Sequence, residues 1–169
     1  MTRRVYHATA FHDRSNDMTG RKDSAARTHD TSHGMHAPEA GVRESRTVLV
    51  ANSNLNNQRT IADLLAGQGY RVVMASNGKQ ALCLIEQGGI DLVVSAMTMN
   101  GMDGLELLRA MRDARLAPPV VAVSSGKDVI DEVYLRGASL YGAAKTHSWP
   151  LTPSIFLGDL EEILHLASR

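Results

Sequence analysis

From Arg46 to the end of the chain, short apolar runs alternate with longer amphipathic segments. Apolar runs of this kind, without polar alternation, predict strands covered on both faces. They occupy residues 47–51, 71–75, 91–95, 119–123 and, more weakly, 144–148. Between the runs, apolar residues recur at helical spacing behind capping residues such as Asn54 and Asn77, and glycines such as Gly88 end the pattern. The predicted helices occupy residues 54–66, 77–87, 102–114, 128–141 and 153–167.

The order of these elements predicts a topology. Strands that alternate with helices of this length imply right-handed βαβ crossovers and therefore a parallel sheet. In an open parallel sheet, ligand chemistry belongs at the carboxyl ends of the strands. The candidate site is therefore expected in the residues that directly follow each strand.

Residues 1–45 lack any sustained hydrophobic period and are rich in polar side chains. Such a segment cannot bury enough apolar surface to offset the entropy lost on ordering, so we predict a disordered tail before a domain over residues 46–169. The spacing of His29, His33 and His36 suits a transition metal, but no cysteine or ordered scaffold supports it, and no metal site is predicted. An alternative explanation of the tail is that translation begins at Met18 or Met35.

Composition narrows the class of protein. Hydrophobic residues make up 43% of the 169 residues and the formal net charge is +0, which allows a packed core and gives no electrostatic signature of nucleic-acid binding. No apolar stretch is long enough to span a membrane. The single cysteine, Cys83, falls on a predicted apolar helix face, as expected for a small buried hydrophobe in a reducing compartment. We therefore expect a cytoplasmic protein without nucleic-acid or membrane partners.

Residues 91–108 have the sequence DLVVSAMTMNGMDGLELL. This segment resembles, nearly position for position, the third strand, phosphorylation loop and third helix of the receiver domain of two-component response regulators. Residues 67–72, 75–82 and 150–153 resemble the family's segments around the second strand and before the final helix. The resemblance implies an α/β, flavodoxin-like (βα)5 fold with a doubly wound parallel five-stranded sheet of strand order 2-1-3-4-5. It also implies a role in bacterial phosphorelay signalling.

The resemblance implies which groups a working site needs. In the family, an adjacent acidic pair after the first strand and an aspartate ending the third hold Mg²⁺, which prefers carboxylate oxygens. That aspartate is the nucleophile that takes the phosphoryl group from a histidine kinase. A Ser or Thr ending the fourth strand bonds the phosphoryl oxygens, and a Lys ending the fifth neutralises the developing charge.

Matched residue by residue, this chain lacks the carboxylates. Asn52 and Ser53 stand at the acidic pair, Ala96 at the phosphoacceptor, and Ser124 retains the hydroxyl. The family's switch aromatic in the fifth strand aligns with Thr146. We therefore predict no catalytic residue, no metal ligand and no cofactor, with Mg²⁺ binding lost.

Two registers compete for the lysine position. The family's Gly-Ala pair precedes the lysine by a fixed spacing, and a proline follows the lysine directly. Gly142-Ala143 and Pro150 satisfy this pattern around Trp149, which then takes the position where the family usually has a cis peptide bond. With Gly137-Ala138 as the pair, Lys145 falls one residue too far along and no proline follows. We favour Trp149.

The favoured hypothesis is a stand-alone degenerate receiver that acts as a phosphorylation-independent protein-interaction module and is not an enzyme. In this pseudo-receiver, Trp149 occupies the space that Ala96 leaves, so that packing replaces chemistry. The family usually docks partners near its fourth and last helices, here residues 129–141 and 155–164, and a histidine kinase or phosphotransfer protein is the expected partner. Two alternatives stay open: a conventional phosphoacceptor with a misaligned site, and a small-ligand binder that uses the flavodoxin-like crevice. Partner identity and oligomeric state do not follow from the sequence.

Overall fold

The computed structural model describes residues 45–126 and 129–167, so the tail and its histidines at 29, 33 and 36 lie outside the described residues. In the described part, each strand is followed by a helix. The strands are β1 (Thr47–Ala51), β2 (Arg71–Ala75), β3 (Leu92–Ala96), β4 (Val120–Ser124) and β5 (Lys145–Ser148). The helices are α1 (Leu55–Gly67), α2 (Gly78–Glu86), α3 (Gly104–Asp113), α4 (Val129–Leu140) and α5 (Pro153–Leu166).

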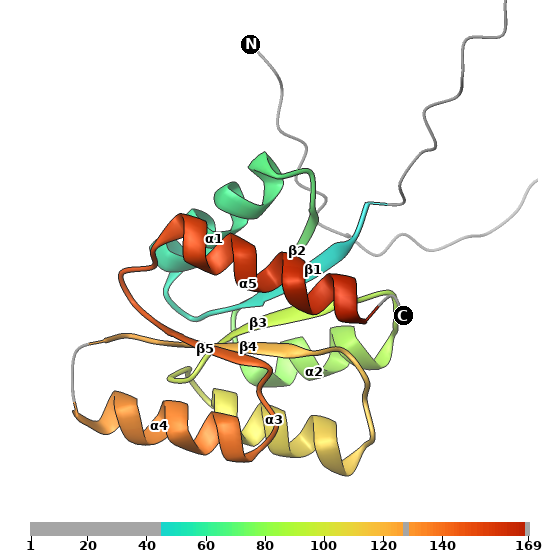
Figure 1. The fold of residues 1–169 in the computed structure, drawn as a ribbon. Coiled ribbons are helices and arrows are strands. Elements are labelled where there is room, and N and C mark those ends of the chain that lie inside the picture. The colour runs from blue at the N-terminus through green and yellow to red at the C-terminus, as the bar shows by residue number, and fades with distance from the viewer. Residues whose placement is uncertain (1–44, 127–128, 168–169) are drawn as a thin grey trace, which may run out of the picture. The chain divides into compact units, whose positions relative to one another are not determined.

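The strands form a single five-stranded sheet in the order β2-β1-β3-β4-β5. All four neighbouring pairs are parallel. The crossover helices lie on both sides of the sheet, with α1 and α5 on one face and α2, α3 and α4 on the other (Figure 1). This arrangement confirms the predicted flavodoxin-like topology and its strand order.

Each face of the sheet carries its own hydrophobic core. Along β1, Val48 and Val50 belong to the cluster that includes Phe156 of α5, whereas Leu49 and Ala51 belong to the cluster that includes Leu107 of α3. Side chains alternate between the two faces of a strand, so a strand with helices on both faces must be apolar throughout. The continuous apolar runs in the sequence are therefore explained by the two layers of helices.

Helix α3 begins two residues later than the sequence pattern predicts, at Gly104 rather than Met102. Asp103 accepts a hydrogen bond from the Glu106 backbone N–H at 2.8 Å, and the Glu106 side chain accepts one from the Asp103 backbone N–H at 2.9 Å. This reciprocal pair is a capping box, which satisfies two backbone donors at the helix start. Asp103 is thus the N-cap and not a residue of the first turn.

Cys83 is exposed, so the prediction of a buried thiol was wrong. The buried positions of α2 are Gly78, Ala81 and Ile85. Residues two positions apart on a helix point in nearly opposite directions, and Cys83 lies two positions from both Ala81 and Ile85. Helix α2 therefore turns the thiol toward solvent.

Asp91 lies just before β3 and joins it to the start of β1. Its carboxylate accepts a hydrogen bond from the Thr47 backbone N–H at 2.7 Å and pairs with the Arg46 guanidinium at 3.0 Å. The contact lies at the amino ends of the strands, far from the expected site, so Asp91 is a structural residue.

No helix within residues 45–126 and 129–167 is long and apolar enough to cross a membrane.

Candidate functional site

The carboxyl ends of four strands bring the sequence-predicted positions to one edge of the sheet. Ala51, the last residue of β1, lies opposite Ser95 of β3. Ala96 ends β3 and lies opposite Val123, and Ser124 ends β4 opposite Ser148. Parallel strands end at a common edge, which is where this fold class places its ligand chemistry. The positions of Asn52, Ser53, Ala96, Ser124 and Trp149 therefore follow one another across this carboxyl edge.

Asn52 is built into a turn at the end of β1. Its side chain is 6% exposed, and its Oδ1 accepts a hydrogen bond from the Asn54 backbone N–H at 2.9 Å. Its backbone N–H donates to the Ala75 carbonyl at 3.0 Å. An asparagine that accepts from the backbone two residues on forms an Asx turn, which directs the chain into the following helix. Ser53, inside this turn, is half-buried.

Gln58 of α1 is a buried polar residue at this edge that the sequence pattern did not single out. It is 5% exposed, and its Nε2 donates to the Val50 carbonyl at 3.3 Å and to the Ala75 carbonyl at 2.7 Å. One amide thus ties the ends of β1 and β2 to the first turn of α1. A glutamine in an otherwise polar helix start carries no sequence signal for this role, because its partners are backbone atoms of two separate strands.

Ala96 presents only a methyl group at the end of β3, and it is 8% exposed. The neighbouring Ser95 is fully buried, and its hydroxyl donates to the Ala96 carbonyl at 3.1 Å. The first residue of α3, Gly104, donates its backbone N–H to the Met97 carbonyl at 2.9 Å. The end of β3 is therefore held by backbone contacts and offers no ionisable group.

Ser124 is the retained hydroxyl, and it forms a pair with Ser148 of β5. The two Oγ atoms are 3.2 Å apart, and Ser124 is 2% exposed. The Ser124 carbonyl also accepts from the Trp149 backbone N–H at 3.0 Å. The hydroxyl at this position is thus engaged with the neighbouring strand. Ser148 was missed in the sequence, because the pairing depends on the register between β4 and β5.

Trp149 directly follows β5 at the carboxyl edge, and the Trp149–Pro150 peptide bond is cis, as expected. Its half-buried ring packs against the core cluster of the α1 and α5 face, whereas Ala96 belongs to the cluster of the opposite face. The expectation that Trp149 occupies the space left by Ala96 was therefore wrong. After the last strand residue, the alternation of side chains no longer determines on which face a side chain packs.

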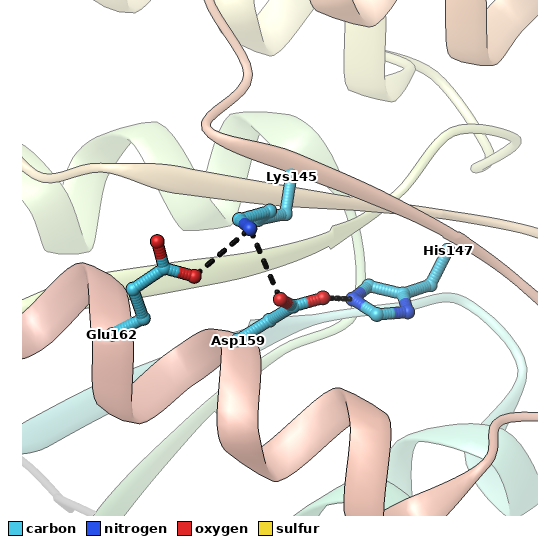
Figure 2. A network of polar contacts seen from close by, with 4 residues as sticks. All are labelled: Lys145, His147, Asp159 and Glu162. Atoms are coloured by element: carbon cyan, nitrogen blue, oxygen red, sulfur yellow. Dashed lines mark hydrogen bonds and ion pairs between the residues drawn. The ribbon is translucent and has the colours of Figure 1, made fainter.

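Lys145 lies at the opposite end of β5 from Trp149. It is the first residue of the strand, opposite Val121, and its Nζ pairs with Asp159 at 3.1 Å and Glu162 at 3.0 Å, both on α5 (Figure 2). Hydrogen bonds to Glu162 and then to Asp159 raise the pKa of Lys145. The next residue, Thr146, is half-buried opposite Ala122. The lysine is thus engaged on the α5 side, away from the carboxyl edge.

His147 completes this polar network and was not predicted from the sequence. Its Nε2 lies 3.2 Å from Oδ2 of Asp159 but is buried and makes no aligned hydrogen bond within the described residues (Figure 2). Its ring packs edge-to-face on Phe156, with centroids 5.3 Å apart. Burial lowers the pKa of His147, an effect that the Asp159 carboxylate opposes and the charge of Lys145 reinforces. The only sequence feature that could have placed His147 beside Lys145 is their spacing, because residues two positions apart on a strand lie on the same face.

This lowered pKa predicts a loss of stability at acidic pH. The folded chain binds a proton at His147 less readily than the unfolded chain, whose histidine has the ordinary pKa of 6.5. The neutral His147 therefore makes its full contribution to the free energy of unfolding above pH 6.5. This contribution is lost as the pH falls from 6.5 toward the folded-state pKa of His147, at no more than about 1.4 kcal/mol per pH unit. Urea unfolding across this range checks it, with His147→Gln as the control that cannot titrate. If the free energy of unfolding falls equally with pH in both proteins, His147 is not the group responsible for the loss of stability.

Within residues 45–126 and 129–167, no group of three or more His, Cys, Asp or Glu side chains is placed to hold a metal ion. The site consists of the amide of Asn52, the hydroxyls of Ser53 and Ser124, the methyl group of Ala96 and the indole of Trp149. The amide, the hydroxyls and the indole N–H can form hydrogen bonds, the methyl group cannot, and none of the five side chains carries a charge at neutral pH.

Comparisons with known proteins agree with this fold. Residues 48–143 match the family model described as the response regulator receiver domain. The chain is 34% identical over 86 residues to the sensor histidine kinase RcsC of Salmonella typhimurium, covering 51% of this chain and 9% of that protein. It is 33% identical over 100 residues to the transcriptional regulatory protein ZraR of Klebsiella oxytoca, covering 58% of this chain and 23% of that protein. The chain thus spans only a small part of these relatives.

Solved structures show the same fold. A CheY-like response regulator receiver domain protein from Methanospirillum hungatei superposes with a TM-score of 0.65 at 20% identity, covering 73% of this chain and 97% of that one. The chemotaxis protein CheY4 of Vibrio cholerae superposes with a TM-score of 0.62 at 21% identity, covering 70% and 98%. The family model, the sheet order and these neighbours agree, and the chain belongs to the response regulator receiver domain family.

Proposed function

We propose that this receiver domain works without phosphorylation, as a degenerate receiver that binds protein partners in two-component signalling. The observation that carries the proposal is Ala96 at the end of β3, the position that resembles the family's phosphoacceptor. A methyl group cannot act as the nucleophile that receives a phosphoryl group. The adjacent Ser95 does not replace it, because its hydroxyl is fully buried and bonded to the backbone.

The residues at this edge do not fit a Mg²⁺ ion. Asn52 and Ser53 are neutral, and the Asn52 oxygen that could face a cation already accepts from the Asn54 N–H. Protein sites for Mg²⁺ rely on one or two carboxylates, and the positions at this edge supply none. We therefore propose no metal-dependent step, no bound cofactor and no catalytic activity for this domain.

The positive charge of a working receiver is also absent from the proposed site. Trp149 stands at the carboxyl end of β5, and Lys145 is held at the other end by two acidic side chains of α5. The substitutions are compatible with one another, because an edge without carboxylates needs no counter-charge. Asn52 and Ser124 form neutral hydrogen bonds with Asn54 and Ser148 at this edge.

A domain that signals by binding a protein partner needs an exposed surface with apolar side chains. On α4, Val133 is 65% exposed and Leu140 is 85% exposed, and on α5 Ile155 is 60% exposed. These exposed apolar side chains offer apolar surface that a protein partner could cover. Thr146 supplies no aromatic side chain to report the state of the site, so we propose constitutive docking over α4 and α5. A histidine kinase or a phosphotransfer protein is the expected partner.

The lone tryptophan provides the test. Because Trp149 lies at the proposed edge, its fluorescence should report any ligand bound there. We expect no saturable change on adding Mg²⁺ up to millimolar concentrations, with or without beryllofluoride. Incubation with acetyl phosphate and Mg²⁺ should leave the intact mass unchanged. Unfolding in guanidinium chloride, which must shift the emission, controls for the sensitivity of the reporter.

Two outcomes contradict the proposal. Saturable Mg²⁺ quenching, or a phosphorylated species by mass, means that the chain is a conventional phosphoacceptor. A small ligand that raises the unfolding temperature and shifts the Trp149 emission favours a ligand-binding crevice, because a ligand that binds only the folded state stabilises it.

A further inference from the structure

The loop between β3 and α3 exposes an asparagine directly before a glycine. Asn100 and Gly101 are both exposed, between the buried Met99 and the half-buried Met102. Gly101 has a φ of +76°, and a β-carbon there would meet no atom within 4 Å. Among the described residues, none hydrogen-bonds to the Asn100 carboxamide or to the Gly101 N–H. The two methionines anchor the loop and leave its tip in water.

Asparagine is chemically labile where its side chain and the next backbone nitrogen can meet. The backbone nitrogen of the following residue attacks Cγ of the carboxamide, a five-membered succinimide closes, and ammonia leaves. Water then opens the ring at either carbonyl and gives aspartate or isoaspartate. Overall, one water is consumed and one ammonia is released, without an oxidant or a cofactor. A glycine in the second position favours ring closure, because it has no β-carbon to hinder the attack.

We propose that Asn100 is a site of spontaneous deamidation, which adds a carboxylate to the carboxyl edge of the sheet after the chain has folded. Asn100 lies four residues after Ala96, in the loop that follows the carboxyl end of β3, and the five candidate positions at that edge are neutral. An isoaspartate also lengthens the backbone of the loop by one carbon. The proposal does not depend on the proposed function, because the reaction needs only the residues of the loop.

The chain contains a matched asparagine–glycine pair that the fold protects. Asn77 caps α2, and its Oδ1 accepts a hydrogen bond from the Gln80 backbone N–H at 2.8 Å. The nitrogen of Gly78 donates to the Met102 carbonyl at 3.1 Å, and Gly78 is buried at the start of the helix. The side chain and the attacking nitrogen are therefore both engaged. Asn77–Gly78 is thus held by hydrogen bonds, whereas the carboxamide of Asn100 and the N–H of Gly101 have none within residues 45–126 and 129–167.

Peptide mapping of the full chain tests the proposal. After incubation at mildly alkaline pH and physiological temperature, we expect conversion at Asn100 with more isoaspartate than aspartate, and an intact Asn77. In denaturant, the two sites should convert at similar rates, because the hydrogen bonds that protect Asn77 are lost. Conversion at both sites at the same rate in the folded chain, or at neither, overturns the proposal.

Two variants separate the chemistry from the fold. Gly101→Ala should slow conversion at Asn100 about tenfold or more, the effect of about 1.4 kcal/mol added to the barrier. Asn100→Gln should abolish it without changing the backbone, because a glutamine would have to close a larger ring. Circular dichroism confirms that each variant is folded. An unchanged rate in Gly101→Ala means that the Gly101 nitrogen is not the nucleophile.

Discussion

Replacing Gly104 with alanine is expected to destabilise the fold by about 3 kcal/mol and to lower its unfolding temperature by about 10 °C. A β-carbon at Gly104 would collide with the carbonyl oxygen of Ala96 and lie 2.8 Å from Cα of Met97. Both are backbone atoms, so the clash cannot be relieved by rotating a side chain. Either α3 or the end of β3 must move, and the hydrogen bond from the Gly104 N–H to the Met97 carbonyl is lost with it.

The control for this variant is another helical glycine. Gly158 lies in α5 and is exposed, and a β-carbon there would meet nothing within 4 Å. Gly158→Ala should therefore raise stability, by up to about 1 kcal/mol, because alanine is the better helix former. Both changes are measured by urea unfolding of the full chain. If Gly104→Ala is as stable as the unsubstituted chain or more stable, the result contradicts the close contact between α3 and β3.

Replacing Gly126 with alanine is expected to destabilise the chain by about 3 kcal/mol and to move the fluorescence emission of Trp149. Gly126 has a φ of +69°, and a β-carbon there would collide with the carbonyl oxygen of Trp149. The loop after β4 thus lies directly against the backbone at the end of β5. An added methyl group must displace one of the two segments, and the tryptophan reports the displacement.

A second variant separates the destabilising effect of the positive φ from that of the steric collision. Gly89 has a φ of +78°, but a β-carbon there would meet nothing within 4 Å. Gly89→Ala should therefore cost only the strain of an alanine in the left-handed region, about 1 kcal/mol, and leave the Trp149 emission unchanged. Equal losses in Gly126→Ala and Gly89→Ala, with no change in emission, would show that Trp149 does not lie against the loop.

Most of the fold could be predicted from the sequence, because strands buried on both faces must be apolar throughout. The run 47–51 therefore matched the fully buried strand β1 residue for residue, and the run 71–75 matched the edge strand β2, although β2 is only partly buried. Helix starts were less certain. Asp103 falls inside the helix predicted over residues 102–114, and only its hydrogen bonds with Glu106 show that it is the N-cap of α3. Cys83 was misplaced because apolar character alone does not determine which way a short helix turns.

The sequence predicted which residues lie at the candidate site, but not which side chains they contact. The resemblance led to Asn52, Ala96 and Ser124, and the ends of the strands bring those residues to one edge. The contacts of His147 with Asp159 and of Ser124 with Ser148 join residues that are distant in the sequence. Such contacts depend on the packing of α5 and the register of β5, and neither leaves a local pattern in the sequence. The side on which Trp149 packs was unpredictable for the same reason.

The place of Lys145 bears on what a single substitution at Ala96 could restore. Lys145 lies four residues before Trp149, a separation of about 13 Å along an extended strand. In an Ala96→Asp variant, the new carboxylate would find no group of metal-ligating side chains within residues 45–126 and 129–167, and Lys145 would be paired with α5. The groups that the family's phosphotransfer needs would then still have to be supplied at several other positions. Lys145 would stay in its ion pairs with Asp159 and Glu162, so a single change at Ala96 would not bring a lysine to the carboxyl edge.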